Sequence, residues 1–253
     1  MRILFIVAVV FALAPFQAQS AWQLEASQQR PARSPGVIFQ TLTLQNDQTL
    51  EVNLIRFNPR HATLRVLNLP PGTTVAQAVK ANGGLTGVNG GYFKPDRTPL
   101  GLVVSKGVTL HPMETSKILT GVLSVTTRGA SLLRTAEFKA GPGLREALQS
   151  GPFLVDHGKA VAGLNATRAA ERTVLLAERQ GVVALLTTAP VTLAQLGQIL
   201  ATPGLLPGVK VDRALNLDGG SSTALWVDAD PDPISRPEWK TVRNAVAIVP
   251  IAK

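Results

Sequence analysis

The sequence contains no cysteine and few aromatic residues. None of its 253 residues is Cys, one is Tyr, and Phe, Trp and Tyr together make up 5%. The absence of Cys excludes disulfide bonds, thiol catalysis and Cys-based zinc sites. With so few aromatic rings, a broad stacking platform for bases or sugars is not expected. Any function must therefore depend mainly on polar and charged residues.

Histidine motifs and clustered basic residues are also lacking. His61, His111 and His157 are isolated in sequence and no HExxH motif occurs, which counts against a zinc or di-metal phosphoesterase. No Ser stands in a GxSxG motif, so a serine hydrolase has no support. The formal net charge is +9, but Lys and Arg are scattered, so no nucleic-acid partner is predicted. The charge favours solubility and anionic partners such as phosphorylated glycans.

The first twenty residues have the pattern of a secretory signal peptide. A positively charged start is followed by the apolar run ILFIVAVVFALAPF and by AQS, so cleavage is expected before Ala21. A membrane anchor is the alternative, but the apolar run is short for a span. We predict a signal peptide at 1–20, export to the periplasm or beyond, and no stable membrane span after cleavage. Residues 21–37 are expected to form a flexible lead, and 38–253 one domain.

Alternating apolar and polar residues predict many strands and few helices. Strands or hairpins are expected at 36–59, 61–70, 85–93, 101–111, 121–133, 151–161, 172–189, 213–220 and 244–251, and short helices at 74–84, 143–150 and 192–201. Thr192 has the right type and position to be the N-cap of the last helix. This pattern predicts an α+β fold, with a mixed β-sheet core and a few short helices in a single domain.

Three strand ends share one pattern: an apolar run, a polar residue, glycine, and then small or aromatic residues. They are GVNGGYF (87–93), QSGPFLV (149–155) and NLDGGSST (216–223). Glycine lets the backbone approach a ligand, and successive N–H groups in such loops can bind anions. Each loop alone could be an ordinary turn, but the three together favour a functional site.

These motifs, in this order and together with RTVLL at 172–176, resemble the phosphodiester glycosidase domain over roughly residues 80–250. The best-known member of that family removes N-acetylglucosamine from a sugar phosphodiester. The resemblance implies a hydrolase that cleaves the glycosidic C1–O bond of a sugar-1-phosphodiester. With the signal-peptide pattern, this predicts an exported enzyme of envelope or exopolysaccharide metabolism. The sequence departs from the family pattern where two glycines, rather than the frequent three, follow Asp218.

The leaving group decides which residues such a reaction needs. Ordinary glycosidases use two carboxylates, whereas a phosphate departs ionised and needs one carboxylate and a cationic or N–H-rich cradle. Asp218, Asn89 and Arg172 are the catalytic candidates. Asp218 would stabilise the oxocarbenium-like centre, activate water or act as nucleophile, and Arg172, with Arg168 as a weaker alternative, would clamp the phosphate. The expected substrate-binding residues are Gly90, Gly91, Tyr92, Ser150, Gly151, Asn216, Gly219, Gly220, Ser221, Ser222 and Thr223.

Plainer roles stay open for several of these residues. Asp218 could form an Asx-turn within its own loop, or hold a divalent cation together with Asn216 or Asn89. Arg172 could pair with Glu171 at the surface. The expected ligand is a sugar phosphate or a phosphorylated glycan, no cofactor is certain, and a metal requirement is left undecided. The alternative function is a non-catalytic module that binds phosphorylated glycans.

Overall fold

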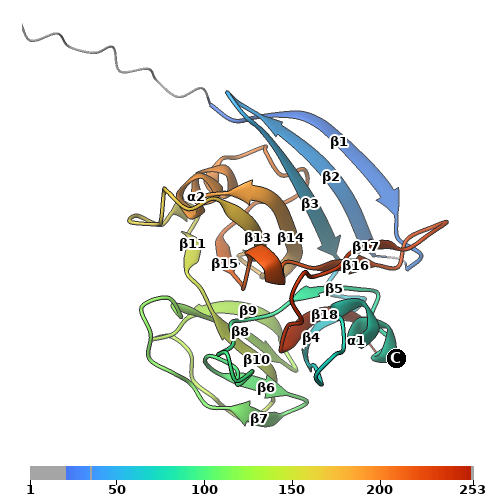
Figure 1. The fold of residues 1–253 in the computed structure, drawn as a ribbon, viewed down its shortest axis with the longest axis vertical. Helices are drawn as coiled ribbons and strands as arrows, with labels where there is room; N and C mark the ends of the chain where they lie inside the picture. Colours follow the sequence, from blue (N-terminus) through green and yellow to red (C-terminus); the bar gives the residue numbers. More distant parts are fainter. Residues whose placement is uncertain (1–20, 35, 252–253) are drawn as a thin grey trace, which may run out of the picture.

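The computed structural model describes residues 21–34 and 36–251. The predicted signal peptide lies outside the described residues. Within them the chain forms three β-sheets, two short α-helices and one turn of 3-10 helix (Figure 1). The predicted α+β class, with a sheet core and few helices, is confirmed. The sheets are not mixed, because every strand pair among the described residues is antiparallel.

The largest sheet has eight strands, and every strand pair in it is antiparallel. In spatial order they are β1 (Gln23–Pro31), β2 (Val37–Gln45), β3 (Thr49–Phe57), β14 (Gly181–Val191), β13 (Ala170–Glu178), β15 (Arg213–Asn216), β11 (Phe153–Asp156) and β12 (Lys159–Ala160). The expected hairpins at 36–59 and 172–189 are β2–β3 and β13–β14.

Two five-stranded antiparallel sheets complete the core, and we call them the second and third sheets. The second contains β7 (Val108–His111), β6 (Val103–Ser105), β10 (Leu144–Ser150), β8 (Gly121–Thr126) and β9 (Gly129–Arg134). The third contains β17 (Ile234–Arg236), β16 (Leu225–Val227), β5 (Thr86–Asn89), β18 (Asn244–Pro250) and β4 (Ala62–Asn68).

The three sheets share one apolar core. Phe153 of the large sheet, Leu123 of the second and Ile248 of the third belong to the same buried cluster. Burial of such side chains is the main force that holds the sheets together.

Each helix covers the outer face of one sheet. Helix α2 (Leu193–Ala201) packs on the large sheet and α1 (Val75–Ala81) on the third. Both begin with a capping box, in which a Thr hydroxyl accepts the N–H of a Gln three residues later, so each helix start is fixed by its own sequence. The predicted N-cap at Thr192 is confirmed.

Each of the three glycine motifs carries the chain from one sheet to another. After β5 the chain leaves the third sheet for β6 of the second. After β10 it leaves the second sheet for β11 of the large sheet, and after β15 it leaves the large sheet for β16 of the third. We call these segments the three crossovers. Because they link the three sheets in a cycle, they can meet at one place.

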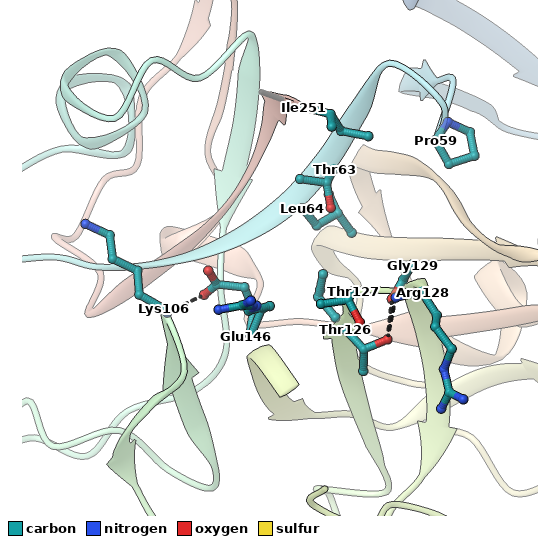
Figure 2. A pocket seen from close by; sticks show the side chains of 12 residues that line it. Pro59, Thr63, Leu64, Lys106, Thr126, Thr127, Arg128, Gly129, Glu146 and Ile251 are labelled. Carbon is teal, nitrogen blue, oxygen red and sulfur yellow. Dashed lines mark hydrogen bonds between the residues drawn. The ribbon is translucent and has the colours of Figure 1, made fainter. Parts of the chain in front are cut away.

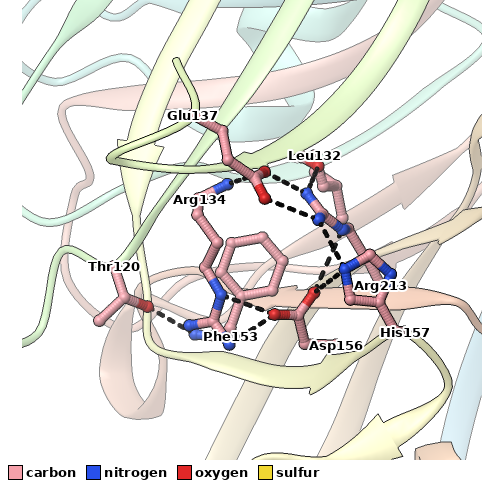
Figure 3. A network of polar contacts seen from close by, with 8 residues as sticks. All are labelled: Thr120, Leu132, Arg134, Glu137, Phe153, Asp156, His157 and Arg213. Carbon is pink, nitrogen blue, oxygen red and sulfur yellow. Dashed lines mark hydrogen bonds and ion pairs between the residues drawn. The ribbon is translucent and has the colours of Figure 1, made fainter.

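An ion-pair network ties the second sheet to the large sheet near the second crossover (Figure 3). Arg134 Nε donates to Asp156 Oδ2 at 2.9 Å, and Arg213 Nη2 donates to Glu137 Oε1 at 2.9 Å. The Arg134 guanidinium also stands over the Phe153 ring, 4.5 Å from its centre. These contacts fix the strand that follows the second crossover.

Two local predictions are wrong. Residues 23–31, expected within a flexible lead, form β1, which pairs with β2 although its own side chains are mostly exposed. Residues 143–150, expected as a helix, form β10 in the middle of the second sheet. In both segments the tertiary neighbours decide the structure, because strand pairing and burial outweigh local propensity.

Candidate active site

A cavity of about 510 Å³ opens where the three crossovers meet. It is lined by Tyr92, Ile118, Pro152, Asn165, Arg168, Ala170, Arg172, Leu193, Asp218, Gly219, Gly220, Ser221 and Ser222. The structure thus places Tyr92, Arg172 and residues 218–222 of the predicted site in one cavity, together with the weaker candidate Arg168.

Hydrogen bonds join the three crossovers directly. The Tyr92 hydroxyl donates to the Gly151 carbonyl at 2.7 Å, and Asn216 Nδ2 donates to the same carbonyl at 3.0 Å. The Asp218 N–H donates to the Gly90 carbonyl, also at 3.0 Å. Segments separated by more than a hundred residues in sequence are therefore held within hydrogen-bond distance of one another.

Asp218 stands at the end of β15 with its carboxylate largely removed from water. Burial raises its pKa, and hydrogen bonding from the Ser222 side chain and the Gly219 N–H opposes that rise. The N–H of Gly219 donates to Asp218 Oδ1 at 2.9 Å. Residue 219 must be Gly, because a Cβ there would lie 2.6 Å from the Glu171 carbonyl oxygen. The loop therefore packs directly against β13.

Arg172 is 9% exposed and its guanidinium is held in a fixed orientation. Nε donates to the Val191 carbonyl at 3.0 Å and Nη2 to the Arg168 carbonyl at 2.7 Å. Burial lowers its pKa, but an arginine stays protonated in proteins. The alternative of a surface pair with Glu171 is wrong, since Glu171 pairs with Arg236.

Tyr92 lies within electrostatic reach of every charged side chain in the cavity. Burial first, and then the nearby Asp218 carboxylate, raise the pKa of Tyr92 to about 12, while Asn216, Arg172 and Arg168 act in the opposite direction. Its phenol therefore stays protonated at neutral pH. In the described chain no ion pair joins Asp218 to either arginine, so these charges are available to a ligand.

Asn89 does not line the cavity, although it was expected to contact substrate. It is fully buried, and its side-chain amide donates to the Asp218 carbonyl at 2.7 Å. Its side-chain oxygen accepts the Thr173 hydroxyl at 2.6 Å and the Ala224 N–H at 3.1 Å. Asn89 is therefore a positioning residue, which fixes the loop that carries Asp218.

The remaining predicted residues are buried and do not line the cavity. They are Gly90, Gly91, Ser150, Gly151, Asn216 and Thr223. The Gly91 N–H donates to Asn244 Oδ1 at 2.7 Å, and a Cβ on Gly90 would lie 2.0 Å from that same oxygen. These glycines serve close packing of the backbone rather than direct contact with the cavity.

Five residues of the cavity wall were not predicted from the sequence. They are Ile118, Pro152, Asn165, Ala170 and Leu193. Pro152 stands inside the QSGPFLV motif and Leu193 follows the Thr192 N-cap, so their positions could have been inferred from those motifs. Ile118 and Asn165 lie in loops without a sequence signature.

A second cavity, of about 500 Å³, lies beside β4 and the β8–β9 turn (Figure 2). The buried Glu146 carboxylate faces it and accepts the N–H groups of Val66 and Lys106, both at 3.2 Å. Burial raises the pKa of Glu146. These bonds satisfy one backbone group on the free edge of β4 and one in the turn between β6 and β7, and none of the three crossovers lines this cavity. Glu146 therefore has a structural role.

The described residues contain no metal-binding cluster of acidic or His side chains and no helix suited to span a membrane. Across residues 21–34 and 36–251, no group of three or more His, Asp or Glu side chains is arranged to hold a metal ion. Of the two residues considered as partners of Asp218 around a cation, Asn89 uses its side-chain oxygen to accept the Thr173 hydroxyl and the Ala224 N–H. The Asn216 amide nitrogen donates to the Tyr92 hydroxyl and the Gly151 carbonyl, and its side-chain oxygen has no hydrogen-bond partner among the described residues. In the same part of the chain, neither helix has the length and apolar character to cross a bilayer.

One carboxylate that shares a cavity with two arginines defines a site for a negatively charged ligand. The sequence comparison agrees with this class, since residues 82–249 match the phosphodiester glycosidase family (NAGPA). The chain belongs to that family. No curated protein matches it in sequence.

Solved structures share the fold at low sequence identity. The zebrafish N-acetylglucosamine-1-phosphodiester alpha-N-acetylglucosaminidase catalytic domain, auto-inhibited by its pro-peptide, is 15% identical with a TM-score of 0.65, and the match covers 92% of this chain and 88% of that one. A hypothetical protein from Synechocystis is 17% identical with a TM-score of 0.59, covering 85% of this chain and 62% of that one.

Proposed function

We propose that this protein is a hydrolase that cleaves the glycosidic C1–O bond of a sugar-1-phosphodiester. The products are the free sugar and a phosphate monoester. The observation that carries the proposal is that Asp218 lines one cavity with Arg172 and Arg168 without an ion pair between them in the described residues. Family membership and the printed activity of the zebrafish relative support it.

The two arginines supply what a phosphate leaving group needs. When the C1–O bond breaks, its electron pair stays on the phosphate oxygen, and the phosphate leaves as an ion without a general acid. Arg172 is oriented by its bonds to two backbone carbonyls, which leave Nη1 for a phosphate oxygen. Arg168 is more exposed and adds a second cation at the mouth.

Asp218 supplies the negative charge for the sugar carbon. Its carboxylate can stabilise the oxocarbenium-like transition state, activate the water, or attack C1 as a nucleophile. In each case the water oxygen ends on C1. Its N–H bond to Gly90 and the Asn89 bond to its carbonyl hold the backbone of this residue in place, and such preorganisation lowers the cost of reaching the transition state.

Replacing the carboxylate tests the proposal. We expect Asp218→Asn to lower kcat/KM by about 10²-fold or more, because an amide can neither carry the charge nor accept the proton. The assay uses UDP-N-acetylglucosamine and p-nitrophenyl sugar phosphodiesters, and release of free sugar is measured. Asp232→Asn, which changes an exposed carboxylate outside the cavity, is the matched control and should hydrolyse them like the wild type.

The alternative function, a module that only binds phosphorylated glycans, predicts a different result. The wild type would then bind the phosphodiesters without releasing sugar, and Asp218→Asn would leave the affinity nearly intact. That outcome would reject hydrolysis.

We also propose that the mature protein begins at Ala21 and acts outside the cytoplasm on envelope glycans or exopolysaccharide. The signal-like pattern of residues 1–20 supports this setting. N-terminal sequencing of the protein recovered from the periplasm or the medium should give Ala21, and recovery of the intact chain from the cytoplasm alone would contradict it.

A further inference from the structure

The cavity around Asp218 has an apolar side that the proposed chemistry does not use. It is formed by Ile118, Pro152, Ala170 and Leu193. They come from four segments: the loop before β8, the second crossover, the first residue of β13 and the first turn of α2. None of these side chains carries a hydrogen-bonding group, so they can contact only the apolar part of a ligand.

The polar groups of the cavity lie on other segments. The loop 218–222 supplies the carboxylate and two hydroxyls, and Arg168 and Arg172 supply the cations. The Tyr92 hydroxyl already donates to a backbone carbonyl, and the Asn165 side-chain oxygen accepts two N–H groups of its own loop. Buried oxygens of a sugar and a phosphate need hydrogen-bond partners. The sugar and the phosphate of a ligand therefore fit against the loop 218–222 and the two arginines.

Ile118 is the most informative member of the apolar side. It is 45% exposed, whereas Ile55 and Ile248 in the core are fully buried. Its carbonyl oxygen packs against the second crossover, since a Cβ on Gly151 would lie 2.1 Å from it, and it accepts the Thr120 N–H at 3.0 Å. When an apolar group covers a large exposed apolar side chain in a cavity wall, the buried surface stabilises the complex.

We propose that the alcohol half of the phosphodiester, beyond the phosphate from the sugar, is an apolar alkyl or lipid-like chain that lies against Ile118, Pro152 and Leu193. The inference rests on the proposed function for the placement of the sugar and the phosphate. A second carbohydrate in this position would bury hydroxyl groups with no partner, which is unfavourable.

Binding of methyl, butyl and hexyl phosphate tests the inference without any turnover. Each methylene that reaches the apolar side should tighten binding about fourfold, so butyl phosphate should bind at least about tenfold more tightly than methyl phosphate in calorimetry. Equal affinities for the three esters would overturn the inference.

A substitution of Ile118 tests whether this residue causes the dependence of affinity on alkyl chain length. Ile118→Ser should reduce the ratio of hexyl to methyl phosphate affinity by about tenfold, because it removes about three carbon atoms from the wall. Val108→Ser is the matched control, since Val108 is 60% exposed and lines no part of this cavity; it should keep the wild-type ratio. Because Ile118 is half-exposed, its replacement leaves the core intact. An unchanged ratio in Ile118→Ser would overturn the inference.

Kinetics separate this inference from the proposed function. Methyl and hexyl esters of a sugar-1-phosphate should both be hydrolysed, the hexyl ester with the higher kcat/KM. Hydrolysis of both at equal kcat/KM would reject the apolar subsite and keep the hydrolase. Failure to hydrolyse either ester, with hexyl phosphate still bound tightly through Ile118, would reject the hydrolase and keep the subsite.

Discussion

The Asp218 carboxylate is largely removed from water, and its pKa is raised for that reason. The folded state therefore disfavours its ionised form relative to the unfolded chain, where the Asp pKa is about 3.9. This cost to stability is present above the raised pKa and absent below about pH 3.9. A residue held in this way favours function at the expense of stability.

This linkage predicts that Asp218→Asn is more stable than the wild type at pH 7, although we expect it to lose activity. An amide has no charge to desolvate, so its melting temperature should be higher. The difference should shrink as the pH falls towards 3, where the wild-type carboxyl is also neutral. Thermal unfolding followed by circular dichroism at both pH values measures this. A variant that melts below the wild type at pH 7 would contradict the assignment, and Asp232→Asn should show no such change.

Asn89 shows what sequence cannot reveal at this scale. The motif GVNGGYF identifies a polar residue at a strand end, but whether its amide faces a ligand or the protein depends on neighbours far along the chain. The amide here bonds Asp218, Thr173 and Ala224. Its position next to the site was therefore predictable from the sequence, but its hydrogen bonding to the loop that carries Asp218 was not.

Asn89→Ala should therefore act mainly through stability. It leaves a buried carbonyl, hydroxyl and N–H without their partner, and each such group costs about 1–3 kcal/mol. We expect the free energy of unfolding to fall by about 3–5 kcal/mol, measured by urea denaturation. Asn68→Ala, an exposed change at the end of β4, is the control. A loss of activity with unchanged stability would instead indicate direct contact with substrate.

For helices and strands, prediction from local sequence succeeds where burial in the fold and strand pairing do not override the local pattern. Both helices with a capping box and the hairpins with clear alternation were predictable from local sequence. The segment LREALQS consists mostly of good helix formers, yet Glu146–Ser150 are all buried within β10. The polar β1 carries no apolar alternation and is held by its backbone pairing with β2, which a sequence pattern does not show.

The network in Figure 3 predicts an acid-sensitive link between two of these elements. The hydrogen bond from Arg213 lowers the pKa of Glu137 to about 2. Because the folded pKa lies below the unfolded value of about 4.3, the pair stabilises the fold above that pH and loses its effect as the pH falls towards 2.

Glu137→Gln should lower the melting temperature at pH 7, and the difference should close between about pH 4.5 and 2. The effect is small, about 1 kcal/mol or less, because the Glu137 side chain is 42% exposed. Thermal unfolding across this pH range measures it, with the exposed Glu51→Gln on β3 as the control. A difference that does not change with pH would contradict the ion-pair origin.

At the scale of the whole molecule, the site follows from the topology. Three sheets are linked in a cycle by three crossovers, and the crossovers meet at the cavity that holds Asp218. The sequence motifs indicated which loops belong to the site, because glycine next to polar residues is rare inside strands. They mark the positions of Pro152 and Leu193 but give no sign of Ile118 or Ala170, so the apolar side as a whole forms from separate segments only after folding.

Cleavage of the C1–O bond requires that the water oxygen ends on the sugar and not on the phosphate. Hydrolysis of a sugar-1-phosphodiester in oxygen-18 water, followed by mass spectrometry of both products, distinguishes the two. We expect the label in the anomeric hydroxyl of the released sugar. Label in the phosphate monoester would mean that the P–O bond is cleaved, and would contradict the proposed mechanism.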